Sequence, residues 1–311
     1  MGERQGDFTD SGELALFKTV QRLPKNFVAA RRSIKSHVRH IRPQIIHAHS
    51  SFAGAFVRLS TRRRDSQKII YTPHGFAFER RDISAFQRWI FRVTETALAF
   101  NTTAIAACSP RELQLSQKLA GSRRDVYVPN VAEELLPHSE VPSFDGIPTV
   151  AAVGRLTAAR DPLFFAEAAR LVRSQQHPIN IVWIGGGDQA YLPVLQDAGV
   201  RVTGWMDRKR AIAELARSTL HVHPAAWDGF PMVLLEANAL RRPSLVRPIE
   251  AFGDVNGAVV AETPEELADK IVRLCTDPSE HSLALKHWDN ELRDNTRQTQ
   301  RDRLHEAYGL V

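Results

Sequence analysis

The chain contains few cysteines and no long apolar runs. Its 311 residues include only two cysteines, Cys108 and Cys275, and both lie in apolar surroundings. A disulfide framework is therefore excluded, and a cytoplasmic location fits. No stretch approaches the roughly 18 apolar residues of a membrane-spanning helix. Residues 1–17 also lack the basic start and apolar core of a secretory signal.

Several signatures of metal sites and catalytic centres are also missing. Ser109 is not part of a Gly-x-Ser-x-Gly turn, so a hydrolase nucleophile is not supported. Two His-x-His pairs, His47/His49 and His221/His223, each place both side chains on one strand face, which a metal could use. No evident third ligand completes either pair. We therefore predict no metal site.

The charge of the chain is unevenly distributed. Residues 1–140 hold 22 Lys and Arg against 13 Asp and Glu, whereas the remainder is slightly acidic. Basic runs occur at 31–42 and 62–65. They are either solvated helix faces or a surface that attracts anionic groups such as acidic lipid head groups. No nucleic-acid motif accompanies them, and aromatic residues are not interleaved with them. We expect peripheral contact with the inner membrane face and no nucleic-acid partner.

Short β-rich runs alternate with amphipathic stretches along the whole chain. Strands are expected at 43–49, 68–72, 103–108, 125–129, 149–154, 179–185, 200–204, 220–224 and 244–247. Helices are expected at 24–41, 84–100, 162–174, 207–218, 231–240 and 263–275. This alternation predicts an α/β fold with two doubly wound, Rossmann-like domains that face each other across a cleft.

A proline-rich stretch without clear periodicity, residues 129–148, separates the two blocks of strands and helices. We expect an N-terminal domain over 1–135 and a linker over 136–148. A C-terminal domain is expected over 149–288. A final helix within 289–311 is expected to pack back toward the N-terminal domain.

Residues 227–237, "WDGFPMVLLEA", place one acid before an apolar helix and another inside it. A helix that begins at Pro231 offers free N–H groups and partial positive charge, which favour a phosphate. Gly229 would allow close approach, and Glu236 could then reach a ribose diol, with Asp228 holding hydroxyl groups. The alternative is a capped helix whose Glu236 forms a salt bridge.

A second glycine-rich segment, "WIGGGDQA" at 183–190, fits the dinucleotide pattern Gly-x-Gly-x-x-Ala after a strand. Asp207 lies near the position expected for the ribose-binding acid. However, the segment sits in the middle of the second domain, and Pro193 interrupts the helix that follows. A dehydrogenase is therefore disfavoured.

The segment "WDGFPMVLLEAN" resembles the acid-x7-acid segment of the family 4 retaining glycosyltransferases, which have the GT-B fold. The first acid of that family is usually Glu, and here it is Asp228. Four other segments match in the right order. They are "PQIIHAHS" (43–50), "YTPHGF" (71–76), "VPN" (128–130) and "AVGRLTAARDP" (152–162).

The resemblance implies a nucleotide sugar bound mainly by the C-terminal domain. Arg155 and Arg160, the latter usually Lys in the family, would neutralise the diphosphate, which gains charge as it leaves. Glu236 would hold the ribose, while Asp228 and His74 would serve the sugar as catalytic residues. The donor-binding set implied is Arg155, Arg160, Gly186, Gly229, Phe230, Met232, Val233 and Glu236. The chain has no Asp-x-Asp, so we expect no cofactor and no metal.

The expected activity is transfer of a sugar from a UDP-sugar, or a GDP-sugar, to a hydroxyl group with retention of configuration. The acceptor is expected to be a growing polysaccharide or a lipid-linked glycan. Two segments depart from the family: the first strand–loop–helix before residues 17–24 is lacking, and 247–254 has few small residues. These departures raise an alternative, a truncated non-catalytic relative that binds a nucleotide sugar or a partner enzyme.

Overall fold

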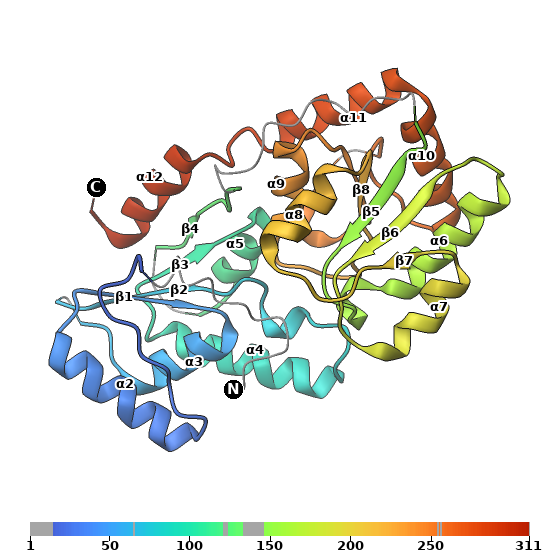
Figure 1. Ribbon diagram of the computed structural model, residues 1–311. Coiled ribbons are helices and arrows are strands. Elements are labelled where there is room, and N and C mark those ends of the chain that lie inside the picture. Colours follow the sequence, from blue (N-terminus) through green and yellow to red (C-terminus); the bar gives the residue numbers. More distant parts are fainter. Residues whose placement is uncertain are drawn as a thin grey trace. The chain divides into compact units, whose positions relative to one another are not determined.

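The computed structural model describes residues 15–64, 66–120, 124–132, 146–253, 255 and 257–310, which divide into two compact units (Figure 1). Unit 1 is built from the described residues of Met1–Glu79, Ser84–Val128 and Arg301–Val311. Unit 2 is built from those of Arg80–Ile83 and Pro129–Gln300. Most of the predicted linker, 136–148, lies outside the described residues, as does the start of the predicted N-terminal domain.

Unit 1 contains a four-stranded parallel sheet in the order β1-β2-β3-β4. Within the described part of the chain, β1 lies at one edge and pairs with β2 alone, in a register that sets Ile45 opposite Lys68. The strands are short, and the two central ones are almost fully buried, as expected for a parallel sheet covered on both faces, whereas β1 has one buried residue, Ala48. Their bounds are β1 Ile45–His49, β2 Lys68–Thr72, β3 Ala104–Ala107 and β4 Val126–Tyr127.

Helices cover both faces of this sheet (Figure 1). On one face lie α2 Phe27–Ile41, α3 Ser51–Ser60, η1 Ala77–Glu79, α4 Ala85–Ala99 and α5 Pro110–Gln117. The start of α4 is fixed by a capping box in which Ser84 and Gln87 exchange side-chain and backbone hydrogen bonds. On the other face the end of α12, Arg297–Tyr308, packs Ala307 and Leu304 against Ile70 and its neighbours.

Unit 2 contains a five-stranded parallel sheet in the order β7-β6-β5-β8-β9. The chain runs outward from β5 through β6 to β7, then returns to β8 and continues outward to β9 on the other side. The order therefore reverses between β5 and β8, which is where ligands bind in open parallel sheets. The strands are β5 Thr149–Val153, β6 Asn180–Ile184, β7 Arg201–Val202, β8 Leu220–His223 and β9 Ser244–Val246.

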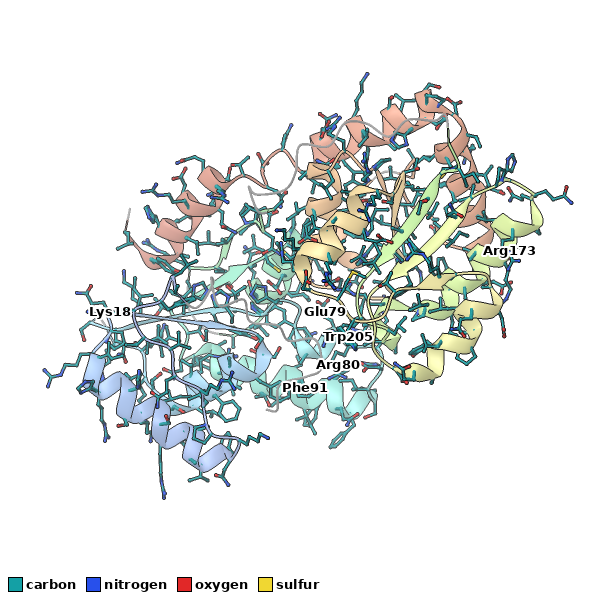
Figure 2. The ribbon with its side chains drawn as sticks, viewed as in Figure 1. Lys18, Glu79, Arg80, Phe91, Arg173 and Trp205 are labelled. Atoms are coloured by element: carbon teal, nitrogen blue, oxygen red, sulfur yellow. The ribbon has the colours of Figure 1, made fainter. Side chains whose placement is uncertain are left out.

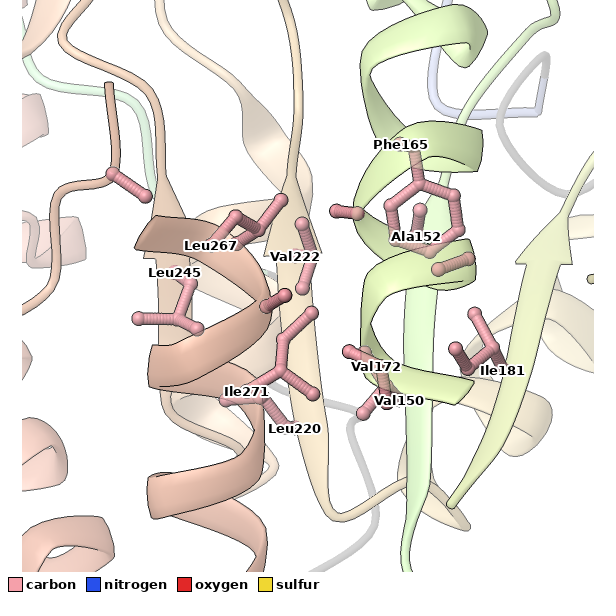
Figure 3. Packing of buried hydrophobic residues seen from close by; sticks show 14 of the residues in the cluster. Val150, Ala152, Phe165, Val172, Ile181, Leu220, Val222, Leu245, Leu267 and Ile271 are labelled. Carbon is pink, nitrogen blue, oxygen red and sulfur yellow. The ribbon is translucent and has the colours of Figure 1, made fainter. Parts of the chain in front are cut away.

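Two helical layers sandwich the sheet of unit 2. One contains α6 Pro162–Ser174, α7 Leu192–Asp197, α10 Pro264–Thr276 and α11 Pro278–Glu291, and the other α8 Arg208–Ala216 and α9 Met232–Ala239. Short η helices cover Ala158–Arg160, Gln189–Tyr191 and Glu250–Phe252. Figure 3 shows Phe165, Val172 and Ile271 meeting the strands in the larger core. The predicted α/β class is confirmed.

Candidate active site

Three polar residues come together where the strand order of unit 2 reverses. Arg160 follows β5, while His223 ends β8 and Asp228 lies in the loop after it. Arg160 forms an ion pair with Asp228, and its Nη1 lies 3.2 Å from Nε2 of His223. Nε2 of His223 also lies 3.4 Å from Asp228 Oδ2. Arg155, exposed, follows the same strand as Arg160. The carboxyl edge of the sheet thus gathers one guanidinium group, one carboxylate and one imidazole in mutual contact.

The protonation of this cluster follows from its surroundings. Burial alone would raise the pKa of Asp228, but the hydrogen bond from His223 and the charge of Arg160 outweigh burial and lower that pKa below its usual range. Burial also lowers the pKa of His223, and the Arg160 charge adds to the effect. We therefore expect an ionised Asp228 and a neutral His223 near pH 7.

The loop after β5 has a defined shape. The backbone N–H of Ala226 donates to the carbonyl of Ala159 at 2.9 Å, which ties the β8 loop to the short helix that carries Arg160. Asp161 caps α6, and its carboxylate accepts a hydrogen bond from Arg247 Nη1 at 2.6 Å. The Arg247 guanidinium also lies 4.0 Å from the centroid of the Phe164 ring. A second arginine is therefore held in place at this edge, directly after β9.

Helix α9 begins one residue later than expected, at Met232, with Pro231 as its N-cap. Asp228 turns back to accept a hydrogen bond from the N–H of Gly229 at 2.7 Å. Phe230 packs edge-on against Phe252, and Met232 is 38% exposed, whereas Val233 is buried. Residues 233–237 are all buried, and Glu236 is the one polar residue among them.

Glu236 has a partner within the protein. Its Oε1 lies 2.7 Å from Nη2 of Arg208, the first residue of α8, and the Glu236 side chain is only 9% exposed. The salt bridge predicted as one alternative is therefore present. Because half of the Arg208 side chain remains exposed, the contact leaves the assignment of Glu236 to a ribose as a prediction.

The glycine-rich turn after β6 presses against neighbouring backbone. A Cβ on Gly185 would lie 2.2 Å from the carbonyl oxygen of Gly154, and one on Gly187 would lie 2.5 Å from that of Leu156. At Gly186 a Cβ would meet Trp205, labelled in Figure 2, at 2.9 Å. The glycines thus allow the ends of neighbouring strands to approach closely. In sequence order the turn follows the second strand of unit 2, not its first.

His74 lies in unit 1, in the turn after β2. Its backbone has a positive φ of 53°, and its Nε2 lies 3.0 Å from Nδ1 of His49. Burial and the charge of His49 lower the pKa of His74. The turn is anchored by the buried Glu112, whose two carboxylate oxygens accept the N–H groups of Gly75 and Cys108, at 2.6 and 2.7 Å.

The two His-x-His pairs are engaged in hydrogen bonds. His47 uses both ring nitrogens, with Tyr308 at 2.9 Å and Thr72 at 2.8 Å. His221 contacts Ser244 Oγ at 2.8 Å through Nδ1. In the described part of the chain, no group of three His, Cys, Asp or Glu side chains is arranged to hold a metal ion.

Sequence reasoning missed three residues of these sites: His223, Arg247 and Glu112. His223 was considered only as half of a metal pair with His221. Its position two residues after His221 at a strand end could have placed it beside Asp228. Arg247 stands at the end of the last strand, a position that favours ligand contacts. Glu112 is three residues after its N-cap Ser109, the position of a capping-box acid.

Comparison with known proteins identifies the family of both halves of the chain. Residues 147–277 match the family described as "Glycosyl transferases group 1", and residues 8–131 match "Glycosyl transferase 4-like domain". A UDP-Gal:alpha-D-GlcNAc-diphosphoundecaprenol alpha-1,3-galactosyltransferase of Escherichia coli is 25% identical over 66% of this chain. The match spans 58% of that enzyme.

Solved structures share the fold. Sucrose-phosphate synthase from Thermosynechococcus elongatus gives a TM-score of 0.74 at 15% identity, over 91% of this chain and 77% of that protein. The Anabaena protein HepE, solved with UDP-glucose, gives 0.72 at 15% identity, over 91% and 82%. Both halves of the chain match one group of enzymes, and the two parallel-sheet units match its architecture. The chain belongs to the group 1 (family 4) glycosyltransferases and has the GT-B fold.

Proposed function

We propose that this protein binds a nucleotide-diphosphate sugar at the carboxyl edge of the unit 2 sheet and transfers the sugar to a hydroxyl group of an acceptor. One observation carries the proposal: Arg160, His223 and Asp228 meet where the strand order reverses, beside the start of α9, and the exposed Arg155 follows the same strand as Arg160. Clustered cations at a helix N-terminus provide a diphosphate with both charge and hydrogen-bond donors. The similarity to a UDP-galactose-dependent enzyme favours a UDP-sugar.

Arg160 would exchange partners during catalysis. It pairs with Asp228, and a bound diphosphate would compete with that carboxylate for the guanidinium group. Asp228 would then be free to accept hydrogen bonds from sugar hydroxyl groups. Its low pKa keeps it ionised throughout the neutral range. Arg155, which is exposed, would be the second donor to the diphosphate. Both arginines stabilise the charge that develops as the diphosphate leaves.

We further propose that transfer proceeds with retention of configuration and without a resident metal. The bond between the anomeric carbon and the diphosphate oxygen breaks, which gives an oxocarbenium-like state. The acceptor oxygen bonds to the same face of that carbon, and the departing phosphate takes the acceptor proton. No protein nucleophile is required. The acceptor would be a polysaccharide or a lipid-linked glycan, as in the name of the E. coli relative.

His74 is our candidate for a residue that acts on the transferred sugar and not on the nucleotide. Its ring is held by His49, and its turn by Glu112. The replacement His74→Ala should therefore reduce kcat and leave the affinity for the nucleoside diphosphate nearly unchanged. Parallel losses in kcat and affinity would indicate a structural histidine instead.

The experiment combines calorimetry and product analysis. UDP and GDP are titrated into the full chain, and a panel of labelled UDP- and GDP-sugars is tested for transfer or slow hydrolysis. In the Arg155→Ala/Arg160→Ala double variant, binding should weaken by about a hundredfold or more, whereas Arg160→Lys should be mild. A matched control is Arg173→Ala, at the far end of α6. Full activity of the double variant would overturn the diphosphate assignment.

The second candidate is a non-catalytic relative, which the departure at 247–254 favours. This segment begins with Arg247, whose Nη1 donates a hydrogen bond to Asp161, a residue outside the segment. Binding of UDP without any transfer or hydrolysis across the panel would support this candidate. Added EDTA tests the metal-free proposal, because activity should then persist.

A further inference from the structure

We propose that the outer face of α4 is a docking surface for an anionic lipid membrane. Four large apolar side chains form a stripe along this helix, which we call the α4 stripe: Phe86, Trp89, Ile90 and Val93. Their exposed fractions are 67%, 59%, 40% and 48%. The spacing i, i+3, i+4, i+7 places them on one side of the helix. The rings of Phe86 and Trp89 stack with centroids 5.9 Å apart.

The α4 stripe faces away from the core of unit 1. The opposite side of α4 is buried through Glu95, Leu98 and Ala99. Phe91, labelled in Figure 2, also packs against the core cluster around Tyr71. The helix therefore already has a buried face, and the stripe is a second apolar face. Soluble proteins rarely expose contiguous apolar surface without an interaction to explain it.

The charge on the helices of this layer is mostly of one sign. The exposed carboxylate nearest to α4 in sequence, Asp82, precedes the helix and pairs with Arg80 at 2.6 Å. Between Glu13 and Asp65 the sequence contains twelve Lys and Arg and no acid. Helix α2, in the same layer as α3 and α4 (Figure 1), exposes Arg31, Arg32, Lys35 and Arg39. On α4, Arg92 is exposed, and the single carboxylate, Glu95, is buried against Arg58. The layer α2–α3–α4 thus presents cations and apolar groups without an exposed carboxylate.

This combination of apolar and basic side chains fits an anionic membrane better than it fits a second copy of the chain or a nucleic acid. An aromatic stripe can insert at the boundary between head groups and acyl chains, while surrounding cations meet anionic lipids. A second copy of the chain would bring the same cations together and repel them. A nucleic acid would contact the cations but leave the apolar stripe exposed. No described helix is long and apolar enough to cross a bilayer, so the contact we propose lies on the membrane surface.

The inference deepens the proposed function, because a lipid-linked acceptor would be met on such a surface. It does not depend on catalysis. Vesicle binding is measured without donor or acceptor, and transfer is measured separately with a water-soluble acceptor. Failure of one assay therefore leaves the other intact.

The experiment is co-sedimentation of the full chain with vesicles of phosphatidylcholine, with and without phosphatidylglycerol. We expect binding to the anionic vesicles that weakens as salt rises. The double variant Phe86→Ser/Trp89→Ser should lose about tenfold or more in binding. The matched control is Leu163→Ser/Leu283→Ser, because these unit 2 residues are 53% and 60% exposed; its binding should stay within about twofold.

The charge is tested by Arg31→Gln/Arg32→Gln/Lys35→Gln, which should weaken binding to anionic vesicles and flatten its salt dependence. Circular dichroism and transfer to a soluble acceptor check that each variant is folded. Equal binding by the α4-stripe and control variants would overturn the proposal. So would equal binding to neutral vesicles. Sedimentation velocity tests whether a second copy of the chain occupies the α4 stripe instead. If the chain self-associates, does not bind vesicles, and loses self-association in Phe86→Ser/Trp89→Ser, the stripe is a protein interface and the proposal is wrong.

Discussion

Each unit contains an arginine–carboxylate pair with an aromatic partner, and the two pairs differ in burial. In unit 1, Arg58 pairs with Glu95 at 2.9 Å, and side-chain exposures are 0% and 6%. Tyr71 donates to the same carboxylate at 3.0 Å and lies under the guanidinium at 3.9 Å. In unit 2, Arg160 and Asp228 are 27% and 16% exposed, beside His223.

The difference separates a structural pair from a pair that a ligand can reach. The unit 1 pair lies between α3, α4 and the middle of the sheet, where burial raises the pKa of Tyr71 and keeps its hydroxyl protonated. The unit 2 pair lies at the carboxyl ends of the strands, where solvent reaches it. A buried pair is costly to break, whereas an accessible one can exchange partners.

The largest effect is expected from the unit 1 pair. The replacement Glu95→Gln leaves Arg58 buried and unpaired, so the free energy of unfolding should fall by about 3–5 kcal/mol. Urea titration followed by circular dichroism measures this loss. The affinity of the remaining folded protein for UDP should be unchanged. A loss below about 1 kcal/mol would show that this pair is as replaceable as a surface contact.

The corresponding change in unit 2 should have the opposite profile. Asp228→Asn removes a charge that still has access to water, so stability should change by no more than about 1–2 kcal/mol. Transfer should fall by about a hundredfold or more, because the predicted contact with the sugar is lost. Initial rates and melting curves of the same preparation test both statements. A large fall in stability with normal transfer would reverse the comparison.

A second carboxylate of unit 2 tests how far ligand access extends along α9. Glu236→Gln should weaken UDP binding by about 1.5–3 kcal/mol, or ten- to a hundredfold, because an ionised acceptor becomes neutral. Its partner Arg208 provides the control, since Arg208→Gln breaks the same ion pair and keeps the carboxylate. Calorimetry with UDP on both variants separates the ribose role from the salt bridge. Unchanged affinity in Glu236→Gln would end the ribose assignment.

The smallest expected effect is the pH dependence of stability. Because Asp228 has a lowered pKa, its carboxylate should stay ionised between pH 7 and 5. His47 also stays neutral in the folded protein over this interval, because burial and the charges of His49 and His74 lower its pKa from 6.5 to about 3. In the unfolded chain its ordinary pKa lies within the interval. As the pH decreases from 7 to 5, His47 therefore binds a proton in the unfolded chain but not in the folded one. The free energy of unfolding should decrease by about 2 kcal/mol over this interval through His47. His47→Gln should lose correspondingly less, as urea titration at both pH values would show.

Most of the fold could be predicted from local sequence. Helices were expected at 84–100, 207–218 and 263–275, and the first residue of each range, Ser84, Asp207 and Thr263, is the N-cap of a helix. The side chain of each accepts a hydrogen bond from a backbone N–H of the first turn. The short apolar runs are parallel strands, as expected for sheets whose two faces are both covered by helices. Pro231 was expected inside its helix and is its cap instead, since its extended ψ of 120° does not continue a helix.

The contacts of the site were harder to predict, because they join distant residues. Arg160 and Asp228 were both predicted to serve a ligand, but their ion pair spans 68 positions and depends on β5 lying beside β8. Glu236 and Arg208 likewise meet because α8 and α9 share a layer. Strand order is not encoded in any local sequence pattern. Contacts that depend on it, such as these ion pairs, could therefore not be predicted. His223 was missed for the same reason.

The glycine turn at 185–187 limits how this protein can change. Its backbone lies so close to Gly154 and Leu156 that no larger residue fits at Gly185 or Gly187. Evolution therefore cannot change the shape of the turn by placing side chains at these two positions. A changed preference for the proposed donor would have to arise at predicted donor-binding residues with exposed side chains, such as Arg155 and Met232. The turn thus divides the site into a part that is fixed during evolution and a part that can vary.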